Sequence, residues 1–213
     1  MKKLVIAILA VGTLSATAQD SGNARTGDME TLVNSGGFGG MLSITTKASS
    51  LNKQECLLVG AEVAMIFGHS LNIGFAGYGL TTRVQSNNQD IDGHNLFYDM
   101  GYGGFFIEPV ILSKKLVHVT FPVVLGAGGV GESYSRMYDY NENMNYNDNW
   151  DPYYSDAFLV AEPGISAELN IARWMRLSAG ASYRFVSQLD LPNTPSNAFS
   201  GVAGNVSIRF GWF

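Results

Sequence analysis

The residues best suited to acid–base chemistry lie close together in the middle of the chain. His94 is accompanied by Asp90, Asp92 and Asp99, and a carboxylate can orient an imidazole so that it acts as a general base. The spacing matches no defined catalytic motif, and no serine stands in a recognisable nucleophile context. We therefore predict no catalytic residue. An enzyme that acts on lipid or peptide near the outer rim of the protein, centred on His94, is the alternative.

A second candidate site is the segment 130–156, which is rich in aromatic and acidic residues. Its aromatic binding candidates are Tyr138, Tyr140, Tyr146, Trp150, Tyr153 and Tyr154. Rigid rings among adaptable Asn and Asp side chains are typical of binding surfaces, so we predict that this segment binds a surface glycan or a protein. A flexible polar loop without a partner is the alternative. The spacing of the acidic residues matches no defined calcium loop, and we predict no metal ion and no cofactor.

Charged residues at alternating positions of apolar segments form a third group. They are Glu62, Glu162, Glu168, Arg176, Arg184 and Arg209. Successive side chains of a β-strand point to opposite faces, so these charges share a face that excludes the apolar residues. An unpaired charge in a dry interior is costly. We predict a network of salt bridges that fills a narrow interior, and the alternative is a gate or a ligand site.

The alternation that positions these charges is clearest in residues 156–213. Leu159, Ile165 and Leu169 fall on odd positions, whereas the even positions from 162 to 170 carry Glu, Gly, Ser and Asn. A membrane barrel turns its apolar face outward to lipid and keeps a polar interior. A soluble exported barrel that binds an apolar ligand is the alternative, but its charges would point outward and its aromatic residues inward.

Eight strands are predicted from this alternation. Their ranges are 37–46, 56–67, 71–84, 95–111, 117–129, 157–170, 174–187 and 199–213. The connections after the second, fourth and sixth strands are short. The longer and more polar connections are 47–55, 85–94, 130–156 and 188–198. Short periplasmic turns and long outer loops are typical of an outer-membrane barrel. The predicted fold class is all-β, an eight-stranded antiparallel transmembrane β-barrel whose side chains fill its interior.

The N-terminus predicts export. Lys2 and Lys3 precede an apolar stretch at 4–14, which is too short to span a bilayer, and small residues at 16–18 form a cleavage pattern. We predict a signal peptide at 1–18, a flexible lead at 19–33 and the barrel at 34–213. Removal of the two lysines takes the net charge from −5 to −7, and such an acidic exported chain argues against nucleic acid as a partner. Cys56 is the only cysteine, so no intrachain disulfide can form.

Two glycine- and aromatic-rich segments carry a family resemblance. Together with the exported start, the eight-strand alternation and the terminal Phe213, the segments MGYGGFF at 100–106 and VVLGAGG at 123–129 resemble small bacterial outer-membrane β-barrels of the OmpA transmembrane-domain type. The resemblance covers about residues 34–213. It implies a Gram-negative outer membrane as the location, with outer-membrane lipid and the barrel assembly machinery as partners.

The C-terminus departs from the pattern of that family. The usual assembly signal places apolar side chains on the same parity as the terminal aromatic residue, whereas Ile208, Phe210 and Trp212 lie one position off Phe213. Either Trp212 is the effective signal residue or a bulge shifts the register. The predicted function is a non-enzymatic outer-membrane barrel with a structural or surface-interaction role, because loops on a rigid scaffold commonly carry binding.

Overall fold

The computed structural model describes residues 38–89, 93–113, 115–133 and 154–213. The strands are β1 (Phe38–Leu51), β2 (Gln54–Phe67), β3 (Leu71–Leu80), β4 (Val84–Gln89), β5 (Asn95–Ile111), β6 (Val117–Thr120), β7 (Val123–Ser133), β8 (Tyr154–Ala172), β9 (Met175–Val186) and β10 (Gly201–Trp212). Within these ranges, no helix is long and apolar enough to cross a membrane.

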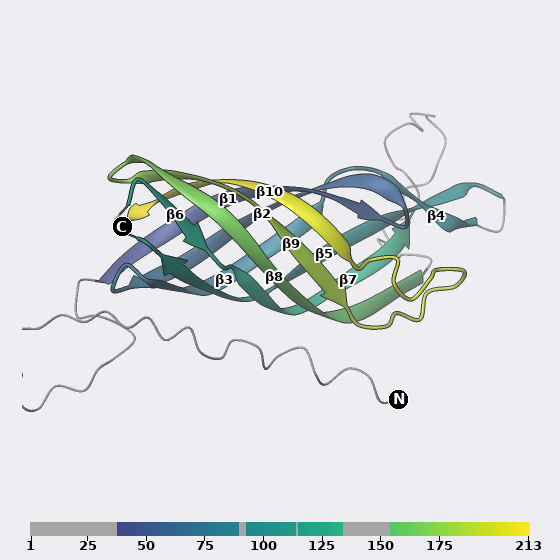
Figure 1. Ribbon diagram of the computed structural model, residues 1–213. Helices are drawn as coiled ribbons and strands as arrows, with labels where there is room; N and C mark the ends of the chain where they lie inside the picture. The colour runs from purple at the N-terminus through teal and green to yellow at the C-terminus, as the bar shows by residue number, and fades with distance from the viewer. Residues whose placement is uncertain (1–37, 90–92, 114, 134–153) are drawn as a thin grey trace, which may run out of the picture. The chain divides into compact units, whose positions relative to one another are not determined.

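The strands close into a ring of antiparallel pairs (Figure 1). β1 pairs with β2 on one side and with β10 on the other, and the pairing continues through β9 and β8. β8 pairs with β6 and β7, both of these pair with β5, and β5 pairs with β3 and β4. Pairing of β3 with β2 completes the circle. β4 continues the line of β3, and β7 continues that of β6. The ten strands therefore occupy eight positions around the barrel, which confirms the predicted fold class.

At two of these eight positions the structure has two shorter strands where one continuous strand was predicted. Gly79 pairs with Gly101 but Val84 pairs with Tyr98, so two extra residues form an irregularity between β3 and β4, as in a β-bulge. The other interruption separates β6 from β7 at Pro122, which has no N–H to donate to a neighbouring strand. The predictions of continuous strands at 71–84 and 117–129 are therefore wrong in these details.

The barrel has two distinct ends. The turn end carries the connections 68–70, 112–116 and 173–174 together with Phe38 and Phe213, and the opposite loop end carries the described connections 52–53 and 187–200. The predicted loop at 47–55 is wrong, because β1 and β2 continue to a two-residue turn at Asn52 (φ 46°) and Lys53 (φ 64°). Two such left-handed residues match the twist of a tight hairpin. The predicted signal peptide and lead lie outside the described residues.

The wall separates an apolar outer surface from the interior. Ala179 and Ile208 face outward, whereas their neighbours Ser178 and Ser207 are buried inside. Other large exposed apolar side chains are Leu42, Ile44, Val63, Phe75, Phe105, Leu125, Ile165 and Val206. This arrangement is the opposite of a soluble barrel with an apolar ligand inside, because a soluble protein rarely exposes so large an apolar surface.

The C-terminal register contains no bulge. Ser49 pairs with Ala203 and Gly40 with Trp212, so β1 and β10 keep one register throughout. Trp212 consequently stays on the outward parity of Ile208. The ring of Phe213 lies 3.8 Å from Cζ of Arg176, a side chain that is buried in the interior.

The interior is layered, and part of it is apolar although a polar interior was predicted. Near the loop end it is apolar, and this layer contains Leu51, Leu58, Val84, Leu96, Tyr98, Met100, Val130, Phe158, Val160 and Phe199. Two glycines make room for rings in or beside it. A Cβ atom at Gly60 would lie 2.3 Å from Cδ1 of Tyr78, and one at Gly128 would lie 2.5 Å from Cζ of Phe158. Larger residues at these two positions would displace the rings.

Candidate functional site

The first part of the candidate site is a cluster of charges in the turn-end half of the interior, centred on Arg209. Its guanidinium donates to both carboxylate oxygens of Glu108, with Nη1–Oε1 at 2.6 Å and Nη2–Oε2 at 2.8 Å. Nη1 also donates to Oε2 of Glu168 at 3.2 Å, and Nη2 lies 3.8 Å from Oε2 of Glu62. A bidentate arginine–carboxylate pair is among the strongest side-chain interactions, so Arg209 holds β10 against β5 across the interior.

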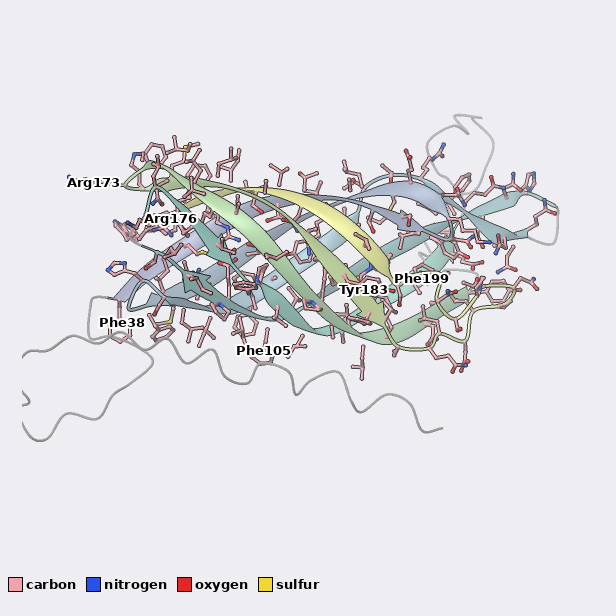
Figure 2. The ribbon with its side chains drawn as sticks, in the orientation of Figure 1. Phe38, Phe105, Arg173, Arg176, Tyr183 and Phe199 are labelled. Atoms are coloured by element: carbon pink, nitrogen blue, oxygen red, sulfur yellow. The ribbon has the colours of Figure 1, made fainter. Side chains whose placement is uncertain are left out.

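Glu168 connects this pair to two further side chains, Arg176 and His118. Its Oε1 accepts from Nη1 of Arg176 at 3.4 Å, and its Oε2 lies 3.3 Å from Nε2 of His118. Nη1 of Arg176 is also 3.5 Å from the same nitrogen of His118. Figure 2 labels Arg176 near the turn end of the barrel. The cluster thereby joins side chains of β5, β6, β8, β9 and β10.

A second cluster lies next to the first, around Glu162. Its Oε1 accepts from Nζ of Lys47 at 2.8 Å and from Oγ of Ser182 at 2.5 Å, and its Oε2 accepts from the hydroxyl of Tyr102 at 2.5 Å. Nζ of Lys47 also lies 3.5 Å from the centroid of the Tyr78 ring, an attractive cation–π geometry. The Tyr78 hydroxyl donates to Oε1 of Glu62 at 2.7 Å, which links the two clusters.

Arg184 is buried but pairs with no carboxylate among the described residues. Its Nε donates to the backbone carbonyl of Phe199 at 2.8 Å. Within the described residues, its Nη1 and Nη2 have no hydrogen-bond partner. Arg184 thus holds the segment 187–200 from the inside of the barrel, through one hydrogen bond from its guanidinium to the carbonyl of Phe199.

The six charged residues predicted for the interior are therefore all buried there, but they divide into two clusters and the separate Arg184. Sequence reasoning missed Lys47 and His118 as members of the network. Lys47 was missed because the first strand was predicted to end at residue 46. Its odd parity, shared with Ser43 and Thr45, was the available signal. An internal cavity of about 20 Å³ beside Glu62 and Arg209 is large enough for about one water molecule.

The second part of the site is a network of side-chain amides at the loop end. We call it the amide network, and it consists of the side chains of Asn52, Gln54, Asn87, Asn88 and Asn193. Nδ2 of Asn52 donates to Oδ1 of Asn87 at 3.1 Å, and Nδ2 of Asn87 donates to the carbonyl of Asn193 at 2.9 Å. Gln54 bonds both backbone groups of Gln85, at 2.7 and 3.1 Å. These bonds fix the β1–β2 turn, β4 and the segment 187–200 to one another.

The segment 187–200 packs over the apolar layer at the loop end of the interior. Leu189, Leu191 and Phe199 are buried against that layer. The hydroxyl of Tyr98 lies 2.9 Å from Oγ1 of Thr194, and Nδ2 of Asn88 donates to both the carboxylate of Glu132 and the carbonyl of Pro192. Figure 2 labels Phe199 towards the end opposite Phe38 and Arg173. This segment was predicted as an outer loop, and its role as a cover was not predicted.

The other predicted site residues are only partly described. Tyr154 begins β8 and is 41% exposed, whereas Tyr138, Tyr140, Tyr146, Trp150 and Tyr153 lie outside the described residues. His94 is exposed, its neighbours Asp90 and Asp92 are also not described, and Asp99 accepts a hydrogen bond from Oγ of Ser133. In the described part of the chain, no three His, Cys, Asp or Glu side chains are placed to hold a metal ion.

Comparison with solved structures identifies the fold. The N-terminal β-barrel domain of Pseudomonas aeruginosa OprF aligns with a TM-score of 0.50 at 7% identity, covering 81% of this chain and 96% of that domain. Neisserial surface protein A aligns with a TM-score of 0.53 at 7% identity, covering 83% of this chain and 97% of that protein. No protein-family model and no curated protein sequence matches the chain. The predicted resemblance to small outer-membrane β-barrels is thus confirmed at the level of the fold.

Proposed function

We propose that this protein is an integral outer-membrane barrel whose closed interior anchors a rigid polar surface, and that this surface binds a glycan or a protein outside the cell. The amide network is the observation that carries the proposal. Its side-chain amides hold the β1–β2 turn, β4 and the segment 187–200 in one arrangement. A fixed arrangement of polar groups lowers the entropy lost on binding.

The wall supports the membrane location. β1 has 14 residues and β9 and β10 have 12 each, whereas a tilted strand needs about 9–11 to cross the hydrocarbon. Phe75 and Phe105 are 62% and 61% exposed, and lipid is the solvent that favours this exposure. Aromatic residues at the turn end, Trp174 and Trp212, fit the interfacial belt of such a barrel.

The filled interior supports an anchor rather than a pore. Salt bridges occupy the turn-end half, and the apolar layer together with the segment 187–200 occupies the other half. An eight-stranded barrel has room for side chains and little else. We expect no ion conductance from the protein in planar bilayers, and no enzymatic step is assigned to it.

The location is tested by fractionating cells that express the protein. It is expected in the outer membrane, resistant to carbonate extraction, and to show heat-modifiable migration on gels. Recovery of folded protein in the soluble periplasmic fraction would overturn the membrane assignment.

The binding role is tested with purified, refolded protein on arrays of bacterial and host glycans and on immobilised host cells. The doubly substituted Asn87→Ala/Asn193→Ala variant is expected to lose at least about tenfold in affinity. Each side-chain hydrogen bond that is lost removes about 0.5–1.5 kcal/mol of the free energy that holds the binding surface in its fixed arrangement. Asn170→Ala is the matched control, because its amide bonds only the carbonyl of Lys115 at the turn end. Equal binding by both variants would refute the proposal.

A further inference from the structure

An apolar groove crosses the outer surface of the barrel at its turn end. Its volume is about 990 Å³, and it runs from β10 across β1 and β2 to β3. The lining used in the argument below consists of Gly40, Met65, Phe75, Phe105, Trp174 and Trp212. This size is at the upper end of the range of about 300–1,000 Å³ for small-molecule pockets.

The groove exists because one outward position on β1 has no side chain. Gly40 pairs with Met65 of β2 and with Trp212 of β10, and both neighbours project outward. A Cβ atom at Gly40 would meet only the carbonyl oxygen of Ala64, at 3.9 Å. The close packing of the barrel therefore does not require glycine at this position, and the missing side chain opens a slot between two large ones.

Rigid aromatic residues form one side of the slot. Trp212 is 82% exposed and Trp174 is 59% exposed. The Trp174 ring stacks on Phe210 with a centroid distance of 6.0 Å and an interplanar angle of 13°. The carbonyl of Trp174 also accepts from the backbone N–H of Gly211 at 3.0 Å, which fixes the β8–β9 turn to β10. The Trp174 side of the slot is thus fixed by ring stacking and by a backbone hydrogen bond.

The described turns next to the groove carry positively charged side chains. Lys115 lies in the turn at 112–116 and Arg173 in the turn at 173–174, and none of the turns at 68–70, 112–116 and 173–174 contains an acidic residue. Arg173 directly precedes Trp174 of the groove, and Figure 2 labels Arg173 at the same end as Phe38. A cation beside an apolar slot is complementary to a molecule with an anionic head and a hydrocarbon tail.

We propose that the groove binds one acyl chain of an anionic phospholipid, with the phosphate of that lipid held at Arg173. The proposal rests on the membrane location proposed above and adds a defined ligand. A second copy of the chain fits less well. A two-fold dimer in a membrane places the same patch against itself at the same depth, so it would bring two Arg173 cations and two sets of turn lysines together.

The test uses the refolded full chain in mild detergent and native mass spectrometry, with palmitoyl-oleoyl phosphatidylglycerol and palmitoyl-oleoyl phosphatidylcholine as probes. The parent protein is expected to retain one phosphatidylglycerol with at least about fivefold preference over phosphatidylcholine. Gly40→Leu fills the slot and is expected to abolish that retained lipid. Arg173→Gln is expected to keep lipid binding but to remove the preference for the anionic head.

Gly77→Leu is the matched control. Gly77 also lies on a strand, and a Cβ there meets nothing within 4 Å, but it is not part of the groove lining. Equal lipid retention by Gly40→Leu and Gly77→Leu would overturn the proposal, and so would a protein dimer that Gly40→Leu dissociates. Neither outcome affects carbonate resistance or heat-modifiable migration, so failure of the groove proposal is distinguishable from failure of the membrane assignment.

Discussion

Replacing Arg209 with methionine tests whether the interior network stabilises the barrel. Arg209 is only 2% exposed and binds Glu108 through two hydrogen bonds of 2.6 and 2.8 Å. Its removal leaves the Glu108 carboxylate, which is 0% exposed, with the Asn72 amide at 2.8 Å as its remaining hydrogen-bond partner among the described residues. Breaking one partner of a buried pair costs about 3–5 kcal/mol. We expect Arg209→Met to lower the free energy of unfolding by this amount.

Arg184→Met is the matched comparison. Arg184 is equally buried but contributes one hydrogen bond, to the carbonyl of Phe199. Losing a hydrogen bond to a charged donor costs about 1.5–3 kcal/mol, and relief of the guanidinium's unpartnered N–H groups offsets part of that loss. We therefore expect a loss of about 1.5 kcal/mol or less. Replacing Glu108 with glutamine in the Arg209→Met background should restore part of the stability, since the uncompensated charge is then removed.

The assay is urea unfolding of the refolded protein in lipid vesicles, followed by tryptophan fluorescence and by heat-modifiable migration. The reasoning is refuted if Arg184→Met destabilises the barrel as much as Arg209→Met does. It is also refuted if the Glu108→Gln substitution lowers the stability of Arg209→Met still further, because the carboxylate would then not be the source of the loss.

Three further predictions concern the wall, the outer loop and the cover of the interior. Arginine at Ala179 or Ile208, on the outer face, should cost about 2–4 kcal/mol near the midplane, and a lipid-soluble label should reach cysteines at 179 and 208 better than at 178 and 207. Deletion of residues 136–152 should preserve folding, because loop length contributes weakly to stability, and should abolish surface binding. If that deletion changes no surface phenotype while His94→Ala removes one, the enzyme interpretation replaces the binding one. Leu191→Ala/Phe199→Ala should leave the ion conductance in planar bilayers at zero, because salt bridges still fill the turn-end half of the interior, and measurable conductance would show that the segment 187–200 is the seal.

The sequence predicts which face a side chain occupies better than it predicts its partner. Parity placed Arg209 inside the barrel, but its partner Glu108 is 101 residues away on β5. That pairing depends on which walls lie opposite each other after closure. Local periodicity carries no such information, and the same limit explains why Arg184 was expected in a salt bridge although it bonds the backbone of the segment 187–200.

Strand ends were the other source of error, and they had functional consequences. Ending the first strand at residue 46 excluded Lys47, which is the cation that pairs with Glu162. Polar residues such as Gln85 and Asn87 were interpreted as loop, although β4 continues through them. Hydrogen bonds with β5 and with Gln54 hold this polar segment extended, and neither interaction is visible in the local composition.

The apolar side of the wall changes along β5, and this change explains the layered interior. Near the turn end, Phe105 and Ile107 face outward while Glu108 faces inward. Near the loop end the order is reversed, with Asp99 outward and Leu96 and Tyr98 inward. An apolar face turns away from water, so it faces outward within lipid and inward above it.

In β4, Gln85, Asn87 and Gln89 likewise point outward, and its inward positions hold the apolar Val84 and the buried polar Ser86 and Asn88. The loop-end part of the barrel therefore has the construction of a soluble β-sheet with its own apolar core, and the segment 187–200 covers that core. Such an extension keeps its shape without lipid around it. It can therefore hold the amide network in a fixed arrangement above the membrane, where a ligand in the surrounding medium would meet it.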